Sequence, residues 1–164
     1  MSYRLYKPNS KNTGCAISFY LSFNSGNPDC VFLNMIKQAS WDSKKRNGSF
    51  SKNVNNPNKT ISIKLSINEV GGIINAISSK AEFSGYHRYN DNTTIIKFST
   101  YKKKDGGSAF SLTVTRNSVD KFGLGIENGE AQCIRIYLEE CLHRIFEHEI
   151  DELQKKSLPP DPNF

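Results

Sequence analysis

Apolar and polar residues alternate with a period of two in several short stretches of this chain. Between Cys15 and Phe23 the odd positions are apolar or Cys and the even positions are mostly small or polar, which is typical of a strand with one buried face. "NSGNPD" then supplies a turn, and "CVFLNMIKQASW" (30–41) predicts a second strand. A long polar connection follows over 42–59 and leaves room for a short strand around Phe50.

The stretch "TISIKLSINEVGGIINAIS" (60–78) changes period without a loop. Apolar residues alternate over 61–65, whereas from Val70 to Ile77 they recur with helical spacing. Ser66 and Glu69 stand at the change as S-x-x-E, the capping box in which the Ser hydroxyl accepts from the Glu N–H and the carboxylate accepts from the Ser N–H. A strand is therefore predicted to lead directly into a short helix.

The second half of the chain repeats the order of strands followed by a helix. Alternating stretches predict strands at 81–89, 93–101, 108–116 and 121–126, and "KKKDGG" between two of them is typical of a hairpin. A long helix with one apolar side is predicted from near Asn128. The residues on its apolar side are Ile134, Leu138, Cys141, Leu142, Ile145 and Ile150. The pattern predicts an α+β fold in which an antiparallel sheet followed by a helix occurs twice.

Length and composition limit the class of protein. A chain of 164 residues can bury one substantial core, and we assign residues 1–152 to a single domain and 153–164 to a flexible tail. No apolar stretch reaches the roughly 18 residues of a transmembrane helix, and the first residues lack the apolar segment of a signal peptide. The four cysteines lack CxxC spacing, so we expect reduced thiols and a cytoplasmic location, the host cytoplasm for a phage-encoded protein.

The net charge of +6 is unevenly distributed along the chain. Residues 1–60 hold nine Lys or Arg against two acidic residues, 61–126 hold nine against five, and 127–164 hold four against nine. A basic body with an acidic end favours a polyanionic partner for the first two segments.

No arrangement of residues indicates catalysis. The chain lacks a Gly-rich phosphate loop, a nucleophile elbow and a paired-carboxylate motif. His143, Glu147 and His148 are close in sequence, but their spacing is not that of H-E-x-x-H, and a surface pair of His143 with Glu147 one turn away explains it better. We expect neither an enzyme nor a bound metal or cofactor.

Several segments together resemble the Whirly family of single-stranded DNA-binding proteins. The similar segments are S-I-x-E-V-G at 66–71, E-F followed by His at 82–87, F-x-L-x-V at 110–114 and the final helix, in the family's order. The family's lysine- and glycine-rich strand has no equivalent, since "TGCAISFYLSF" stands in its place. The chain is thus identified as a distant relative of phage or bacterial type.

This resemblance implies two four-stranded antiparallel sheets, each followed by a helix, with the helices at the core of a tetramer or dimer and single strands across the sheet edges. It also implies single-stranded DNA as the partner, bound largely independently of sequence in replication, recombination or repair. An RNA-binding or transcription-regulating protein of the same superfamily, and a structural assembly protein without nucleic acid, are the alternatives.

Exposed aromatic rings can stack on unpaired bases, and Lys or Arg can neutralise phosphates. Tyr20 lies on the polar face of its strand. This position fits a stacking ring and an ordinary exposed strand tyrosine equally well. Trp41, the only tryptophan, precedes a cluster of cations, which fits a ring that stacks on a base. A buried position in the core or at a protein interface is an equally good explanation. The candidate nucleic-acid contacts are Tyr20, Lys37, Trp41, Lys44, Lys45, Arg46, Lys64, Tyr86, Arg88, Lys97, Tyr101, Lys102 and Lys103.

The last residues, "SLPPDPNF", resemble the tails of bacterial replicative single-stranded DNA-binding proteins, which are acidic and end in Phe. Partner proteins capture such tails through the terminal aromatic ring and carboxylate. Asp161 and Phe164 would then bind replication or repair proteins, while a frayed, Pro-rich terminus is the alternative.

Overall fold

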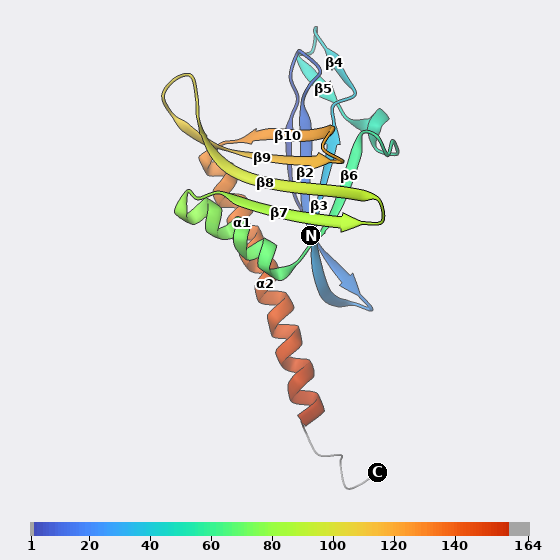
Figure 1. Ribbon diagram of the computed structural model, residues 1–164, viewed down its shortest axis with the longest axis vertical. Coiled ribbons are helices and arrows are strands. Elements are labelled where there is room, and N and C mark those ends of the chain that lie inside the picture. The colour runs from blue at the N-terminus through green and yellow to red at the C-terminus, as the bar shows by residue number, and fades with distance from the viewer. Residues whose placement is uncertain (1, 158–164) are drawn as a thin grey trace.

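The computed structural model describes residues 2–157, which form two four-stranded antiparallel sheets, two α-helices and a small hairpin (Figure 1). The first sheet has the order β1 (Ser2–Lys7), β2 (Cys15–Asn24), β3 (Asn27–Lys37) and β6 (Thr60–Leu65). The second has the order β10 (Asp120–Ile126), β9 (Ser108–Arg116), β8 (Asn92–Lys102) and β7 (Phe83–Tyr89). Helix α1 (Ile67–Ser79) follows the first sheet and α2 (Asn128–Ser157) follows the second. The predicted repeat of sheet and helix is confirmed.

Strand β1 is an element that the sequence pattern does not predict. It pairs with β2 from Ser2 opposite Tyr20 to Lys7 opposite Cys15. Its own alternation is weak because only half-buried side chains face inward. The start of α2 holds it in place, since Lys7 Nζ lies 2.5 Å from Glu130 Oε1. This strand supplies the fourth member of the first sheet.

Strand β3 ends at Lys37, four residues before the predicted end at Trp41. The cause is Gln38, whose buried side-chain oxygen accepts from the backbone N–H of Asn9 at 2.9 Å and of Gly14 at 3.2 Å. Because these bonds satisfy loop amides rather than a strand ladder, the chain turns away here. It forms the hairpin of β4 (Ser40–Asp42) and β5 (Asn47–Ser49), so the short strand expected around Phe50 ends one residue before it, and a 3₁₀ turn, η1 (Ser51–Asn53), follows.

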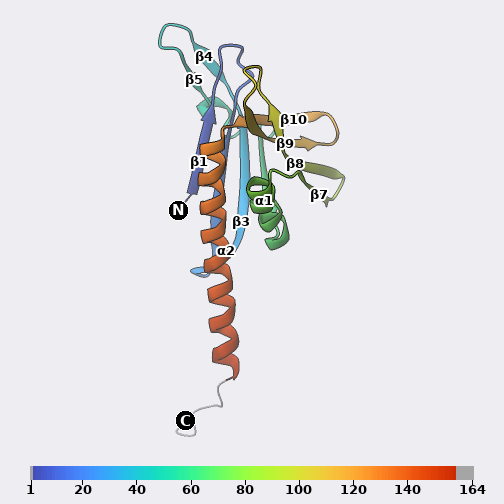
Figure 2. The same ribbon diagram turned by 90° about the vertical axis from the view of Figure 1, so that its left-hand side faces the viewer.

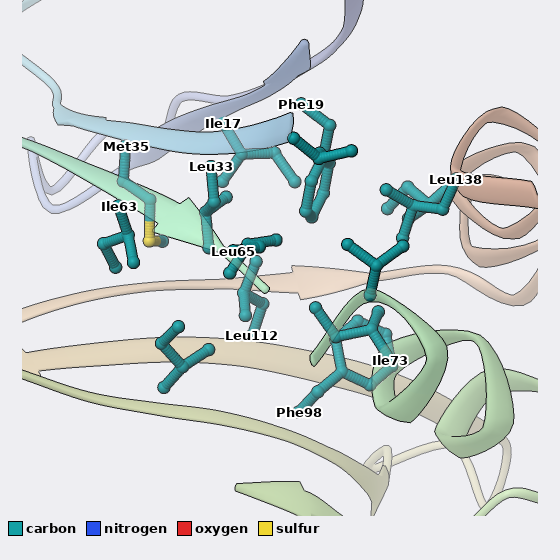
Figure 3. Close-up of a cluster of buried hydrophobic side chains, with 14 of the residues drawn as sticks. Ile17, Phe19, Leu33, Met35, Ile63, Leu65, Ile73, Phe98, Leu112 and Leu138 are labelled. Carbon is teal, nitrogen blue, oxygen red and sulfur yellow. The ribbon is translucent and has the colours of Figure 1, made fainter. Parts of the chain in front are cut away.

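The two sheets pack face to face, with the strands of the second running across those of the first, and both helices lie beside them (Figures 1 and 2). Side chains from both sheets and both helices converge in one core (Figure 3). Members that are fully buried, at 0% exposure, include Phe19, Leu33, Ile73, Phe98, Leu112 and Leu138. Each such side chain contributes about 1.5–3 kcal/mol on burial, so this cluster holds the two halves of the chain together.

The capping box predicted at the start of α1 is confirmed. Ser66 Oγ accepts from the Glu69 N–H at 3.3 Å, and Glu69 Oε2 accepts from the Ser66 N–H at 2.9 Å. The other carboxylate oxygen lies 2.7 Å from His87 Nε2 on β7. A Cβ at Gly85 would come within 2.6 Å of this oxygen and would force the carboxylate to shift. The cap therefore also joins α1 to an edge of the second sheet.

Helix α2 begins at the predicted position and continues to Ser157, past residue 152 where the domain was expected to end. Beside the sheets it buries the predicted stripe, including Ile134, Leu138 and Cys141, but Ile150 is 52% exposed. The reason is that the end of α2 extends beyond both sheets, so nothing in the described chain covers it (Figure 1). Within the described range 2–157, neither helix has the length and hydrophobicity of a membrane-spanning segment.

Candidate nucleic-acid interface

The face of the first sheet that points away from the core is here called the outer face. Because side chains alternate along strands, cross-strand pairing arranges the outward residues in rows from β1 to β6. The aromatic row is Ser2, Tyr20, Phe32 and Lys64, the polar row is Arg4, Ser18, Asn34 and Ser62, and the third row is Tyr6, Ala16, Ile36 and Thr60.

The aromatic row holds two parallel rings. Tyr20 and Phe32 stack with their ring centroids 5.2 Å apart and their planes 9° from parallel. Both rings are only half-buried, so the stack remains accessible at the surface. Lys64 ends the row and lies 3.3 Å from Asp29. A partly exposed pair of rings beside a cation offers stacking and charge together.

A groove with a volume of about 1230 Å³ crosses the outer face. Its floor comes from the polar row and the third row, and its walls come from residues 54–58 and from the β7–β8 and β9–β10 turns of the second sheet. Four exposed side chains stand on its rim, namely Tyr6, Val54, Tyr89 and Val119, with 55–82% of their surface exposed. Exposed apolar groups gathered around one groove are typical of a binding site.

A second hollow of about 370 Å³ adjoins the groove beside Tyr20 and is called the Tyr20 hollow. Tyr20 and Phe23 give it aromatic walls, and it shares Arg4, Ser18 and Asn34 with the groove. Within residues 2–157 the Arg4 guanidinium has no hydrogen-bond or ion-pair partner. The groove and the hollow thus form a continuous surface with an available cation near its centre.

An ion cluster fixes one wall of the groove. Arg116 donates to Asp120 Oδ2 at 2.5 Å and to the backbone oxygen of Pro57 at 3.0 Å, which ties the β9–β10 turn to the segment before β6. Lys37 pairs with the same carboxylate and lies 4.6 Å from the Phe122 ring centroid. Burial disfavours charge on Asp120, but hydrogen bonds from Lys37 and Arg116 outweigh it and lower the pKa of this carboxyl.

The outer face of the second sheet carries a separate group of candidates. Tyr86 and Ile95 are cross-strand neighbours and are 63% and 42% exposed. Lys97 pairs with Glu82 at 3.0 Å. Tyr101 lies over Gly125, where a Cβ would come within 2.8 Å of the hydroxyl. This face has aromatic rings and cations, but none of these residues lines the groove of the first sheet.

The β4–β5 hairpin carries a third group. Asp42 Oδ1 accepts from the backbone N–H groups of Lys44 and Lys45 at 2.9 and 3.0 Å. This Asx-type turn directs the chain through the tip, and both lysines and Arg46 are exposed there. Trp41 is half-buried in β4. The hairpin stands at the opposite end of the molecule from the free end of α2 (Figure 1).

The structure therefore divides the predicted contacts among three surfaces. Tyr20 and Lys64 lie on the outer face of the first sheet. Tyr86, Arg88, Lys97 and Tyr101 lie on that of the second sheet, with Lys102 and Lys103 at its β8–β9 end, and Trp41, Lys44, Lys45 and Arg46 lie in the hairpin. Lys103 pairs with Glu127 at 3.1 Å, and Lys37 is engaged by Asp120 between the sheets. Asp161 and Phe164 lie outside the described residues.

Sequence reasoning missed most of the residues that form the groove. Arg4 and Tyr6 belong to β1, whose alternation of Arg4 and Tyr6 with Tyr3 and Leu5 was the available signal. Phe32 could have been found from its neighbours, because buried Val31 and Leu33 place it on the opposite face. The turn residues Tyr89 and Val119 had no local signal, since only the packing of the two sheets brings them to the first sheet.

Within residues 2–157 no group of three or more His, Cys, Asp or Glu side chains could hold a metal ion. All four cysteines are free thiols, and Cys133 is the exposed one. Burial raises the pKa of the Cys15 thiol to about 11, which keeps it protonated and unreactive at neutral pH.

Two solved plant structures have the same architecture. WHY1 from Arabidopsis thaliana superposes with a TM-score of 0.59 over 100% of this chain and 96% of its own, at 14% sequence identity. The plant transcriptional regulator PBF-2 gives a TM-score of 0.59 over 96% of this chain and 88% of its own, at 17% identity. No family model and no curated protein sequence matches the chain. The chain has the Whirly fold that the sequence resemblance implies.

Proposed function

We propose that this protein binds single-stranded DNA on the outer face of the first sheet, largely independently of sequence and without catalysis. The bases would stack against accessible rings such as the half-buried Tyr20 and the exposed Tyr6, and Arg4 would face a phosphate. Such binding protects or organises exposed strands in replication, recombination or repair.

The observation that carries the proposal is the continuous groove and hollow on this face. It combines a stacked aromatic pair, a rim of exposed apolar side chains and Arg4, which has no partner within residues 2–157. Unpaired bases need flat apolar surface, and the backbone needs positive charge. A protein partner would also use apolar surface, but the surplus of nine basic over two acidic residues in 1–60 favours a polyanion.

Fluorescence anisotropy with a labelled dT oligomer tests the proposal. We expect tighter binding to the single strand than to duplex DNA of the same length, and affinity that falls as salt rises because counterions are released. Equal or tighter binding to duplex, or affinity that salt does not change, would contradict single-strand binding at a basic surface.

A matched pair of double variants then assigns the face. Arg4→Glu with Tyr20→Leu removes one cation and one ring from the first sheet, and Arg88→Glu with Tyr86→Leu does the same on the second. We expect the first double variant to lose about tenfold or more in affinity, since one stacking contact is worth about 1–3 kcal/mol, and the second to lose less. A larger loss of affinity in the second double variant than in the first would assign the binding site to the second sheet.

Transcriptional regulation is the second candidate role, and likeness to the plant transcriptional regulator PBF-2 favours it. RNA is the alternative ligand, because a single RNA strand also presents unpaired bases for stacking and phosphates for cations. Binding of matched dU and rU oligomers, which differ only at the 2′ position, separates DNA from RNA as the ligand, since contacts to the 2′-hydroxyl would favour RNA. Tighter binding of rU would identify RNA rather than DNA as the ligand.

We also propose that the protein assembles through the free end of α2. Phe146, Ile150 and Leu153 are 42–67% exposed and recur at helical spacing along one side. An apolar stripe on an exposed helix is stabilised by packing against a second helix. A second copy of this chain is the natural occupant, because it carries the same stripe and a symmetric pair buries both.

A further inference from the structure

The polar row on the outer face lies between two apolar surfaces. Tyr20 and Phe32 stand in the neighbouring row on one side, and Tyr6 and Ile36 stand on the other. Successive rows on one face of a strand are about 7 Å apart, since each residue advances the chain by about 3.3 Å. A planar base that stacks against a ring in one row therefore has its edge over the polar row.

Asn34 is at the centre of this row, with Ser18 on β2 and Ser62 on β6 as its cross-strand neighbours. Its side-chain amide has no hydrogen-bond partner among residues 2–157. It lines both the groove and the Tyr20 hollow, so it can be reached from either side. A half-buried amide that faces a hollow and bonds to nothing is available to a ligand.

Two other asparagines of the groove, Asn92 and Asn117, differ in this respect. Asn117 donates to Asn92 at 2.8 Å and accepts from the Thr93 N–H at 2.8 Å, so it stabilises the turns of the second sheet. Its positive φ of 52° also fits a turn residue. Asn34 instead sits in the middle of a regular strand, where its side chain has no such structural task.

We propose that Asn34 reads the edge of one unpaired base, preferably adenine, seated in the Tyr20 hollow; this rests on the proposed single-strand binding. The amide offers a donor and an acceptor side by side. Adenine presents the complementary pair at N6 and N7, the pairing that Asn makes in specific readout. Guanine presents two acceptors, O6 and N7, on this Hoogsteen edge and lacks the match there. In this arrangement the Hoogsteen edge of the unpaired base, rather than its Watson–Crick edge, faces Asn34.

Tyr20 supplies the wall against which the base stacks, and Ser2, its small neighbour on β1, leaves the space beside the ring open. Arg4 lies two strands from Asn34, about 10 Å away by strand spacing, where it can reach the phosphate of the same nucleotide. Binding then combines a general stacking and charge contribution with a preference at a single position.

The test compares short dT oligomers that carry one central dA or one central dG. Both purines stack strongly, so the ratio of their affinities isolates the hydrogen-bonded edge. We expect the dA oligomer to bind about fivefold to tenfold more tightly, toward the lower end of the discrimination of a bidentate pair. In Asn34→Ala this ratio should fall to about one. Replacing dA by 7-deaza-dA, which lacks the N7 acceptor, should abolish the preference in the unchanged protein.

Asn68→Ala is the matched control, because Asn68 is exposed on α1 and away from this face. It should keep the ratio of dA to dG, and both variants should unfold at the same temperature as the unchanged protein. If single strands bind but dA and dG bind equally, base reading is wrong and the proposed function stands. If 7-deaza-dA binds as dA does, the N7 contact is wrong. If no single strand binds, the proposed function itself fails.

Discussion

Glu69 links a local sequence motif to the packing of distant strands. One carboxylate oxygen completes the capping box with Ser66 and the other contacts His87, eighteen residues further along the chain. A Cβ at Gly85 would lie 2.6 Å from this second oxygen and would force the carboxylate to shift. The S-x-x-E and G-Y-H segments, which look independent in the sequence, are therefore one cluster, and it fixes the start of α1 against the second sheet.

Ser66→Ala should lower the free energy of unfolding by about 1 kcal/mol, because the Glu69 N–H loses its side-chain acceptor. Urea denaturation followed by circular dichroism measures the change. Ser78→Ala, at the exposed end of the same helix, is the control; its hydroxyl bonds only to the Ile74 carbonyl, so we expect little loss. Equal effects of the two substitutions would mean that the cap contributes nothing specific.

Asp120 should make stability depend on pH in the acid range. Burial opposes its charge, but bonds from Lys37 and Arg116 lower its pKa in the folded state. Its contribution is therefore complete above the unfolded pKa of about 3.9 and is lost as pH falls through the lower folded value.

In Asp120→Asn we expect stability at pH 7 to be lower by about 1–3 kcal/mol, as for a partly buried pair, with the deficit shrinking below about pH 4. Chemical denaturation of both proteins from pH 3 to pH 7 measures this difference. A deficit that does not change with pH would show that lost packing, rather than charge, causes it.

At the scale of elements, the sequence predicts what depends on strict periodicity. Strands β2 and β6, helix α1 and the start of α2 follow from alternation, the capping box and the apolar stripe. The prediction fails at β1, where inward residues are only half-buried, and at the end of β3, where Gln38 satisfies loop amides. These features depend on tertiary contacts, which a local pattern does not contain.

The β4–β5 hairpin is an element whose role in binding can be tested by charge. Lys44→Glu with Lys45→Glu should weaken single-strand binding and make its dependence on salt shallower, because fewer counterions are released. Their backbone N–H groups keep their bonds to Asp42, so the turn should persist. Lys155→Glu with Lys156→Glu changes the net charge equally at the end of α2. The same salt dependence in both variants would place the hairpin outside the binding surface.

At the scale of the whole molecule, the groove escapes sequence reasoning for a geometric reason. Its floor follows from the alternation of the first sheet, but Tyr89 and Val119 reach it only because the strands of the second sheet run across the first. The sequence identifies Tyr20 and Lys64 as outward residues of their strands. It does not show that Tyr86 and Tyr101 lie on a separate surface. The alternation of apolar and polar residues assigns each side chain to a face of its sheet, but only the packing of the two sheets determines which faces lie side by side.

Assembly through α2 is the prediction that belongs to this scale. Ile150→Glu with Leu153→Glu should convert the proposed oligomer to a monomer, since two charges would be buried without partners. Native mass spectrometry measures the mass directly. Ile95→Glu adds a charge at an exposed apolar position of the second sheet and should leave the mass unchanged. If the unchanged protein is a monomer, the proposed assembly is wrong, whereas the proposed DNA-binding site is unaffected by this result.

The groove is built from both halves of the chain, with its floor at residues 4–62 and one wall at residues 89–120. A ligand there can bind only when both halves are folded and docked, so its binding energy is added to the stability of the entire domain. At a ligand concentration one hundred times the dissociation constant, this linkage amounts to about 2.7 kcal/mol. A bound strand would thus protect the core amides of both sheets against hydrogen exchange together, although it touches only one of them.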